Sequence, residues 1–107
     1  DTWYHQFHDY LTTSVLPSDL TSTGKRTFLK RVSRYVVMGG LLYKRGFDGI
    51  LLRCLTGAEV THTIQQVHDG ICGGHFSGLA VAKRILRLGY YWPTLNNDCL
   101  EYVKRCV

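Results

Sequence analysis

The chain has 107 residues, and its apolar fraction of 45% is typical of a foldable globular protein, which excludes a disordered tail. Thirteen Lys and Arg residues outnumber eight Asp and Glu residues, so the formal charge is +5. This charge favours contact with nucleic acid or another polyanion, although a merely soluble basic surface explains it equally well. No apolar run approaches the roughly 20 residues of a membrane span, so we expect no membrane partner.

Four cysteines, Cys54, Cys72, Cys99 and Cys106, would permit two disulfides. The chain opens DTWYHQFHDY, which lacks the basic-then-apolar order of a secretory signal peptide. It also begins without Met, as expected of a piece of a longer protein. We therefore expect an intracellular, reduced protein in which cysteines bind metal or fill the core. An oxidised, disulfide-bonded domain is the alternative that the even count leaves open.

Aromatic and apolar residues recur at helical spacing over residues 2–15, from Trp3 to Val15, and predict a first helix with one aromatic face. Pro17 biases Leu16 away from the helical conformation, so the helix is predicted to end there.

A second helix is predicted to begin near Ser22 or Thr23, with an apolar side that includes Phe28. Its other side carries a basic stripe at spacings of four residues: Arg26, Lys30 and Arg34. Such a stripe either contacts phosphates or is a solvated helix face.

The hydrophobic period changes from that of a helix to that of strands at residue 35. Residues 35–38 and 41–44 predict two strands joined by Gly39 and Gly40, since both glycines can take the positive φ that a two-residue turn needs. A second turn over residues 46–49 leads into residues 50–54. The pattern predicts a small three-stranded antiparallel meander, with Cys54 as a core thiol.

Thr56 and Glu59 form a capping-box pattern, a hydroxyl at the cap and a carboxylate three residues later. The helix that follows is predicted to end near His68, where Gly70 can adopt the left-handed conformation of a helix stop. His68 is therefore expected at the C-terminus of a helix, beside its apolar face.

Ser77 is predicted to cap a helix that runs to about residue 88. Its core side is predicted to hold Leu79, Ala82, Ile85, Leu86 and Leu88. A second basic patch lies opposite: Lys83, Arg84 and Arg87.

A last helix is predicted after Thr94, with apolar positions and cysteines at spacings of three and four from Leu95 to Cys106. Together these elements predict an α+β fold that is mainly helical. Its three parts are an N-terminal helical extension (1–34), the meander (35–55) and a helical bundle (56–107).

His68 and His75 flank a loop that contains a glycine pair, and Cys106 is placed where the last helix could bring it back to them. A structural zinc ion is commonly held in a tetrahedron by two histidines and two cysteines. The spacing is looser than that of a zinc finger. On the residues alone, two unrelated hydrogen-bonded histidines are therefore an equally valid interpretation.

The stretch HDGICGGHFSGLAVAKRILRLGYYWPTLNNDCLEYVKRC resembles the zinc-binding N-terminal module of integrases from gypsy-like LTR retrotransposons. Related modules occur in retroviral integrases, with the pattern His-His then Cys-x-x-Cys. The likeness is carried by the histidine after a glycine pair, by KRIL leading to YYWP, and by YVKRC. Upstream, YVVMGGLLYKRGFDGILLRC resembles the segment that precedes this module in such polyproteins, and residues before it resemble the connection from the ribonuclease H region.

The resemblance implies a module that folds around Zn²⁺, with His68, His75 and Cys106 as ligands. In the family a fourth ligand would be a cysteine three residues after Cys106, and this sequence ends at Val107, so the module is expected to be truncated before it. Cys72 and Cys99 are local substitutes. Two helical turns, about 10 Å, separate Cys99 from Cys106, too far for both to bind one ion. The expectations left open are a weakened three-ligand site, a fourth position filled by water or a neighbour, or no metal.

The resemblance also implies partners: other integrase domains or subunits, in a homo-oligomer, and the ends of the element's DNA. We expect contacts to the phosphate backbone with weak sequence preference, because no helix begins with clustered Asn, Gln and Arg that could read bases. The residues predicted to make them are Arg26, Lys30, Arg34, Lys83, Arg84 and Arg87.

A zinc ion with three protein ligands is also the arrangement of catalytic sites, but no carboxylate is placed as a general base. Asp69 follows a presumed ligand, and Glu101 lies near a helix end. We therefore interpret the chain as a non-catalytic module of a polyprotein enzyme, without a small-molecule substrate, located in a cytoplasmic particle and the nucleus. The alternative is a metal-free, domesticated protein-interaction domain derived from a retroelement.

Overall fold

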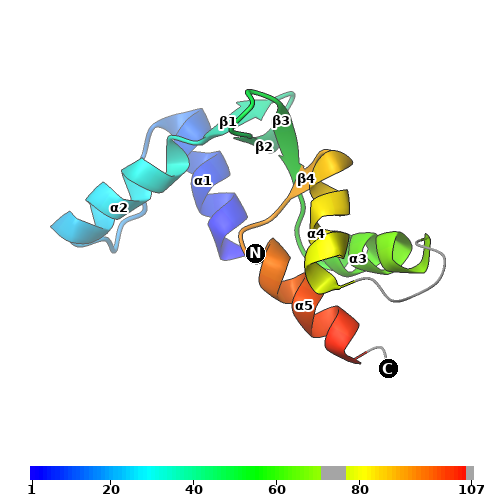
Figure 1. The fold of residues 1–107 in the computed structure, drawn as a ribbon. Coiled ribbons are helices and arrows are strands. Elements are labelled where there is room, and N and C mark those ends of the chain that lie inside the picture. Colours follow the sequence, from blue (N-terminus) through cyan, green and yellow to red (C-terminus); the bar gives the residue numbers. More distant parts are fainter. Residues whose placement is uncertain (71–76, 106–107) are drawn as a thin grey trace. The chain divides into compact units, whose positions relative to one another are not determined.

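A computed structural model of the chain describes residues 1–70 and 77–105 (Figure 1). The fold is α+β and mainly helical, as predicted from the sequence. It divides into two compact units, residues 1–54 and 55–107, which are described in turn. Within the described residues, no helix combines the length and apolar character that crossing a bilayer requires.

The first unit contains two helices and an antiparallel meander. The helices are α1 (Thr2–Thr13) and α2 (Ser22–Val32). The strands are β1 (Tyr35–Met38), β2 (Leu41–Arg45) and β3 (Leu51–Cys54). β2 pairs with β1 on one side and with β3 on the other.

The turn between β1 and β2 confirms the two-glycine prediction. Gly39 and Gly40 have φ values of 58° and 78°, and Met38 stands opposite Leu41 across the turn. Positive φ at both central residues defines the turn whose twist matches that of the strands. A side chain at either position would adopt this backbone only with strain.

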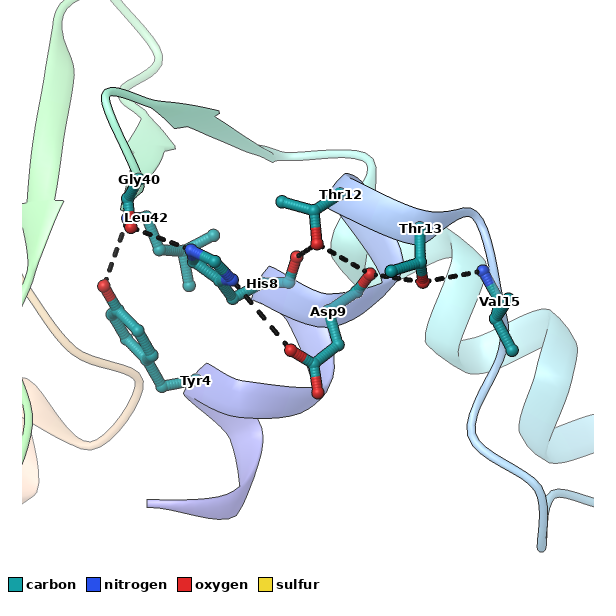
Figure 2. A network of polar contacts seen from close by, with 8 residues as sticks. All are labelled: Tyr4, His8, Asp9, Thr12, Thr13, Val15, Gly40 and Leu42. Atoms are coloured by element: carbon teal, nitrogen blue, oxygen red, sulfur yellow. Dashed lines mark hydrogen bonds and ion pairs between the residues drawn. The ribbon is translucent and has the colours of Figure 1, made fainter.

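Helix α1 ends at Thr13, two residues before the predicted end. Ser14 takes a left-handed conformation, with φ 62°, and donates its N–H to the Tyr10 carbonyl at 2.7 Å. The Thr13 hydroxyl accepts a hydrogen bond from the N–H of Val15 (Figure 2). The predicted place of Val15 on the aromatic face is therefore wrong, and its side chain is 67% exposed.

The core of the first unit is aromatic. The Phe7 ring lies 5.3 Å from Phe28 of α2 and 4.8 Å from Tyr35 of β1, measured between ring centroids. Val32 and Leu42 complete the buried side. This cluster anchors both helices to the meander.

The second unit contains three helices and one two-residue strand. They are α3 (Ala58–Gly70), α4 (Gly78–Arg87), β4 (Tyr90–Tyr91) and α5 (Leu95–Arg105). The Leu55 N–H donates to the Tyr91 carbonyl at 2.9 Å, which ties the start of the unit to its middle.

Helix α3 ends near His68 and Gly70, as predicted, but Gly70 does not have the predicted conformation. The helix begins at Ala58, directly after Gly57, which has a φ of 54°. The Thr56 carbonyl accepts a hydrogen bond from the Glu59 N–H. Gly70 is the last helical residue, and its φ is not in the left-handed region. The predicted glycine stop is therefore wrong. His68 does lie in the last turn, as expected.

Helix α4 begins as predicted, because the Ser77 hydroxyl accepts the Ala80 N–H at 3.1 Å. Its predicted core side is partly wrong: Leu79 and Leu88 are 47% and 57% exposed. The buried residues are Gly78, Val81, Ala82 and Ile85.

The close approach of α5 is the physical reason why α4 buries Val81 and exposes Leu79. A Cβ atom built on Gly78 would lie 2.5 Å from the Leu100 Cα and 2.9 Å from the Cys99 carbonyl carbon. Only glycine allows the two backbones to come so near. The helix therefore turns Gly78 and Val81 inward and Leu79 outward.

Candidate metal centre

His68, the first predicted zinc ligand, lies in the last turn of α3 and is half-buried, with 20% of its side chain exposed. Its ring stands edge-on to Tyr102 of α5, at 5.5 Å between ring centroids. Ile64 and Val67 on the same helix are buried and hold α3 in place. The core of the second unit therefore sets where the His68 ring lies.

The carboxylate of Asp69 lies next to the His68 ring. Its Oδ1 is 3.4 Å from the Nδ1 nitrogen, a distance at which Nδ1–H can donate to the acid. Metal-binding histidines commonly donate one ring N–H to a carboxylate, which fixes the tautomer and leaves the other nitrogen for the metal. His68 therefore fits a zinc ligand that would bind through Nε2. Asp69, set aside above as a base, lies where it would hold the His68 ring if His68 binds zinc.

The other two predicted ligands, His75 and Cys106, lie outside the described residues, as does Cys72. Within residues 1–70 and 77–105, no three His, Cys, Asp or Glu side chains are grouped so that they could hold a metal ion. In the sequence, Cys106 follows Tyr102 by four residues. The contact of His68 with Tyr102 thus places one predicted ligand beside the helix that precedes another, Cys106.

The surroundings of Cys99 are those of a core thiol and disfavour its role as a substitute ligand. Its side chain is fully buried in the core of the second unit. Burial raises the pKa of the Cys99 thiol to about 11, and the negative charge of Asp98 adds to the increase. Zinc binds the thiolate, which this environment disfavours. Cys99 is a core residue.

Cys54, predicted as a core thiol, is buried at the end of β3, which confirms the prediction. Burial raises its pKa to about 12, although Lys44 opposes the increase.

The basic residues predicted to contact DNA are exposed in both units. Lys83, Arg84 and Arg87 lie on α4. Arg26 and Lys30 lie on α2, and Arg34 follows it. The distribution of charge is uneven: residues 1–54 carry eight Lys and Arg against four Asp and Glu, whereas residues 55–107 carry five against four. The first unit therefore holds a net charge of +4 out of the total of +5.

Asp98 is a structural residue that the sequence reasoning did not single out. Its Oδ2 accepts hydrogen bonds from the Trp92 indole N–H and from the Thr94 hydroxyl, both at 2.7 Å. These bonds join the aromatic segment 90–92 to the first turn of α5. The available sequence signal was an acidic residue four positions after Thr94, in the first turn of the helix.

Residues 56–107 match the family model of the integrase zinc binding domain. This part of the chain is therefore similar to the zinc-binding domain of integrases. The match includes α3 with His68, and also α4 and α5, which pack against α3. No curated protein sequence matches the chain. The zinc-binding domain is a non-catalytic part of integrase, in agreement with the interpretation of the sequence.

Proposed function

We propose that the chain is the zinc-binding part of a gypsy-like retrotransposon integrase, where it helps subunits to assemble and to hold the ends of the element's DNA. The observation that carries the proposal is the family match over the helices that position His68. The gypsy-like origin rests on the sequence stretches from HDGICGGH to YVKRC. The first unit adds the upstream segment and most of the positive charge.

Zinc, when bound, would join the end of α3 to the residues that follow α5 and so supplement a small core. His68, His75 and Cys106 would hold it, with Asp69 fixing the His68 ring. A test is to measure zinc content and thermal stability, with and without a chelator, on the chain extended to include a cysteine three residues after Cys106. We expect bound zinc and a lower Tm when the chelator removes it.

Matched variants on one helix make the zinc test specific. His68→Ala should lower zinc content and Tm, because it removes a ligand, whereas His62→Ala should change neither, because His62 is an exposed residue of α3. Absence of zinc, with no effect of the chelator, would contradict the metal site. Equal effects of both variants would assign the loss to the helix itself.

The DNA-binding part of the proposal is supported by the charge and by the exposure of both basic clusters. Binding through phosphates releases counterions, so log K falls with log salt by about 0.9 for each phosphate contacted. Replacing Arg84 and Arg87 together by Ala should lower that slope by up to about 2 and leave the fold intact. Replacing Arg26 and Lys30 should do the same for the first unit.

An unchanged slope in both double variants would place the DNA contact elsewhere. Capture of protein partners in the absence of any salt-dependent DNA binding would favour a protein-interaction domain instead. The assembly role is tested by sedimentation of the zinc-loaded and chelated chain, where loss of an oligomer on chelation is the expected result.

A further inference from the structure

The outer edge of β1, in the first unit, has backbone groups that point away from the meander. The Arg45 N–H donates to the Arg34 carbonyl at 2.8 Å, so Arg34 and Arg45 form a hydrogen-bonded pair at the end of the β1–β2 ladder. Opposed pairs in an antiparallel ladder alternate between bonded and non-bonded. The pair of Val37 and Leu42 is therefore non-bonded, and the N–H and C=O of Val37 face outward from β2.

An independent contact supports the assignment of Val37 and Leu42 as a non-bonded pair. The Leu42 N–H donates to the Tyr4 hydroxyl of α1 at 3.2 Å and so faces away from Val37. On that side of β2, α1 also satisfies the Gly40 carbonyl, which accepts a hydrogen bond from the His8 Nε2–H at 2.8 Å (Figure 2). Helix α1 thus covers the edge of β2 at residues that precede the pairing of β2 with β3, which begins at Tyr43.

The outer edge of β1 is bordered by a groove instead. The groove has a volume of about 460 Å³, and its walls come from α1, α2, β1 and the end of β2. They include Tyr10, Leu11, Leu29, Val36, Val37 and Arg45. Leu29 is 42% exposed although it lies on the apolar side of α2. An edge strand with apolar neighbours is a template for pairing with another strand, and proteins normally protect such edges.

The chemistry of the groove selects its occupant. Its walls are mainly Leu, Val and Tyr side chains, which suit apolar side chains and offer few donors to a nucleic acid phosphate. The Arg45 guanidinium is the cation in the lining, and the first unit carries a net charge of +4. An extended peptide adds main-chain hydrogen bonds at a strand edge and fills pockets with alternate side chains. We propose that this groove binds an acidic, apolar, extended segment of a partner protein as an additional strand beside β1.

The probe is an acetylated and amidated peptide that alternates valine with glutamate, titrated into the full chain labelled with ¹⁵N. We expect saturable shifts of the Val37 amide and of neighbouring amides on β1. A control peptide with lysine in place of glutamate should bind at least about fivefold more weakly, because the groove and its surroundings are basic.

Two pairs of variants locate the site. Leu29→Glu places a carboxylate in the groove and should weaken the glutamate peptide about tenfold or more, whereas Leu79→Glu, at a leucine of similar exposure on α4, should not. Arg45→Gln should weaken it about fivefold, because it removes a charge-assisted contact, whereas Lys104→Gln on α5 should not.

The proposal concerns residues outside the family match and stands independently of zinc and DNA binding. Equal binding of the two peptides, or equal effects within either pair of variants, would overturn it. Shifts of the same β1 amides by duplex DNA that displaces the peptide would assign the groove to nucleic acid. A dimer of the chain alone that Leu29→Glu dissociates would assign it to a second copy.

Discussion

Gly78→Ala should destabilise the second unit more than the addition of one methyl group usually does. The added Cβ would meet the Leu100 Cα at 2.5 Å and the Leu100 nitrogen at 2.7 Å, where ordinary contacts are 3.4–4 Å. These atoms belong to the backbone of α5, so no side-chain rotation relieves the overlap. Helix α5 would have to move by about 1 Å as a unit.

The size of the effect follows from two opposing contributions. Overpacking a well-packed core costs about 1–3 kcal/mol, and the upper part of this range applies where the neighbour is backbone. Alanine regains up to about 1 kcal/mol over glycine in a helix. We expect a net loss of about 2 kcal/mol in the free energy of unfolding, which corresponds to about 10 °C in Tm for a domain of this size.

The assay is urea unfolding followed by tryptophan fluorescence. The chain has two tryptophans, Trp3 in the first unit and Trp92 in the second, so a Trp3→Phe background reports on the second unit alone. Gly70→Ala is the matched control, because a Cβ at Gly70 meets no atom within 4 Å. It should leave stability unchanged or raise it. A Gly78→Ala protein as stable as its parent would refute the close approach of α4 and α5.

Two further predictions concern α5. Asp98→Ala should cost about 1–3 kcal/mol in the free energy of unfolding, because it leaves the buried Trp92 indole N–H without its acceptor. Urea unfolding measures this, and a loss below about 0.5 kcal/mol would contradict it. Burial raises the pKa of the Cys99 thiol from 9.0 to about 11. The contribution of the buried, neutral thiol to the free energy of unfolding is therefore fully present below pH 9 and is lost as the pH rises to about 11. A Cys99→Ala variant should lack that part of the pH dependence, and identical profiles of variant and parent would exclude it.

Local patterns in the sequence predicted the elements well. The turn at Gly39 and Gly40 and the cap at Ser77 depend on neighbouring residues alone, so their residue types were sufficient. The prediction for Gly70 was wrong because a glycine permits the left-handed conformation without requiring it. The end of α1 was missed because a serine, Ser14, took that conformation instead.

The resemblance to the integrase zinc-binding module could be read from the sequence alone, because the histidines and the stretches KRIL, YYWP and YVKRC carry it, and residues 56–107 match that family model. His68 was correctly expected at a helix end, whereas His75 and Cys106 stay predictions. Which side of α4 is buried depends on the packing of α5 against it. Leu79 and Val81 both suit a core, and the glycine-mediated approach of α5 at Gly78 selects Val81. Contacts between distant segments, such as His68 with Tyr102 and the groove beside β1, depend on packing and therefore follow from no local pattern.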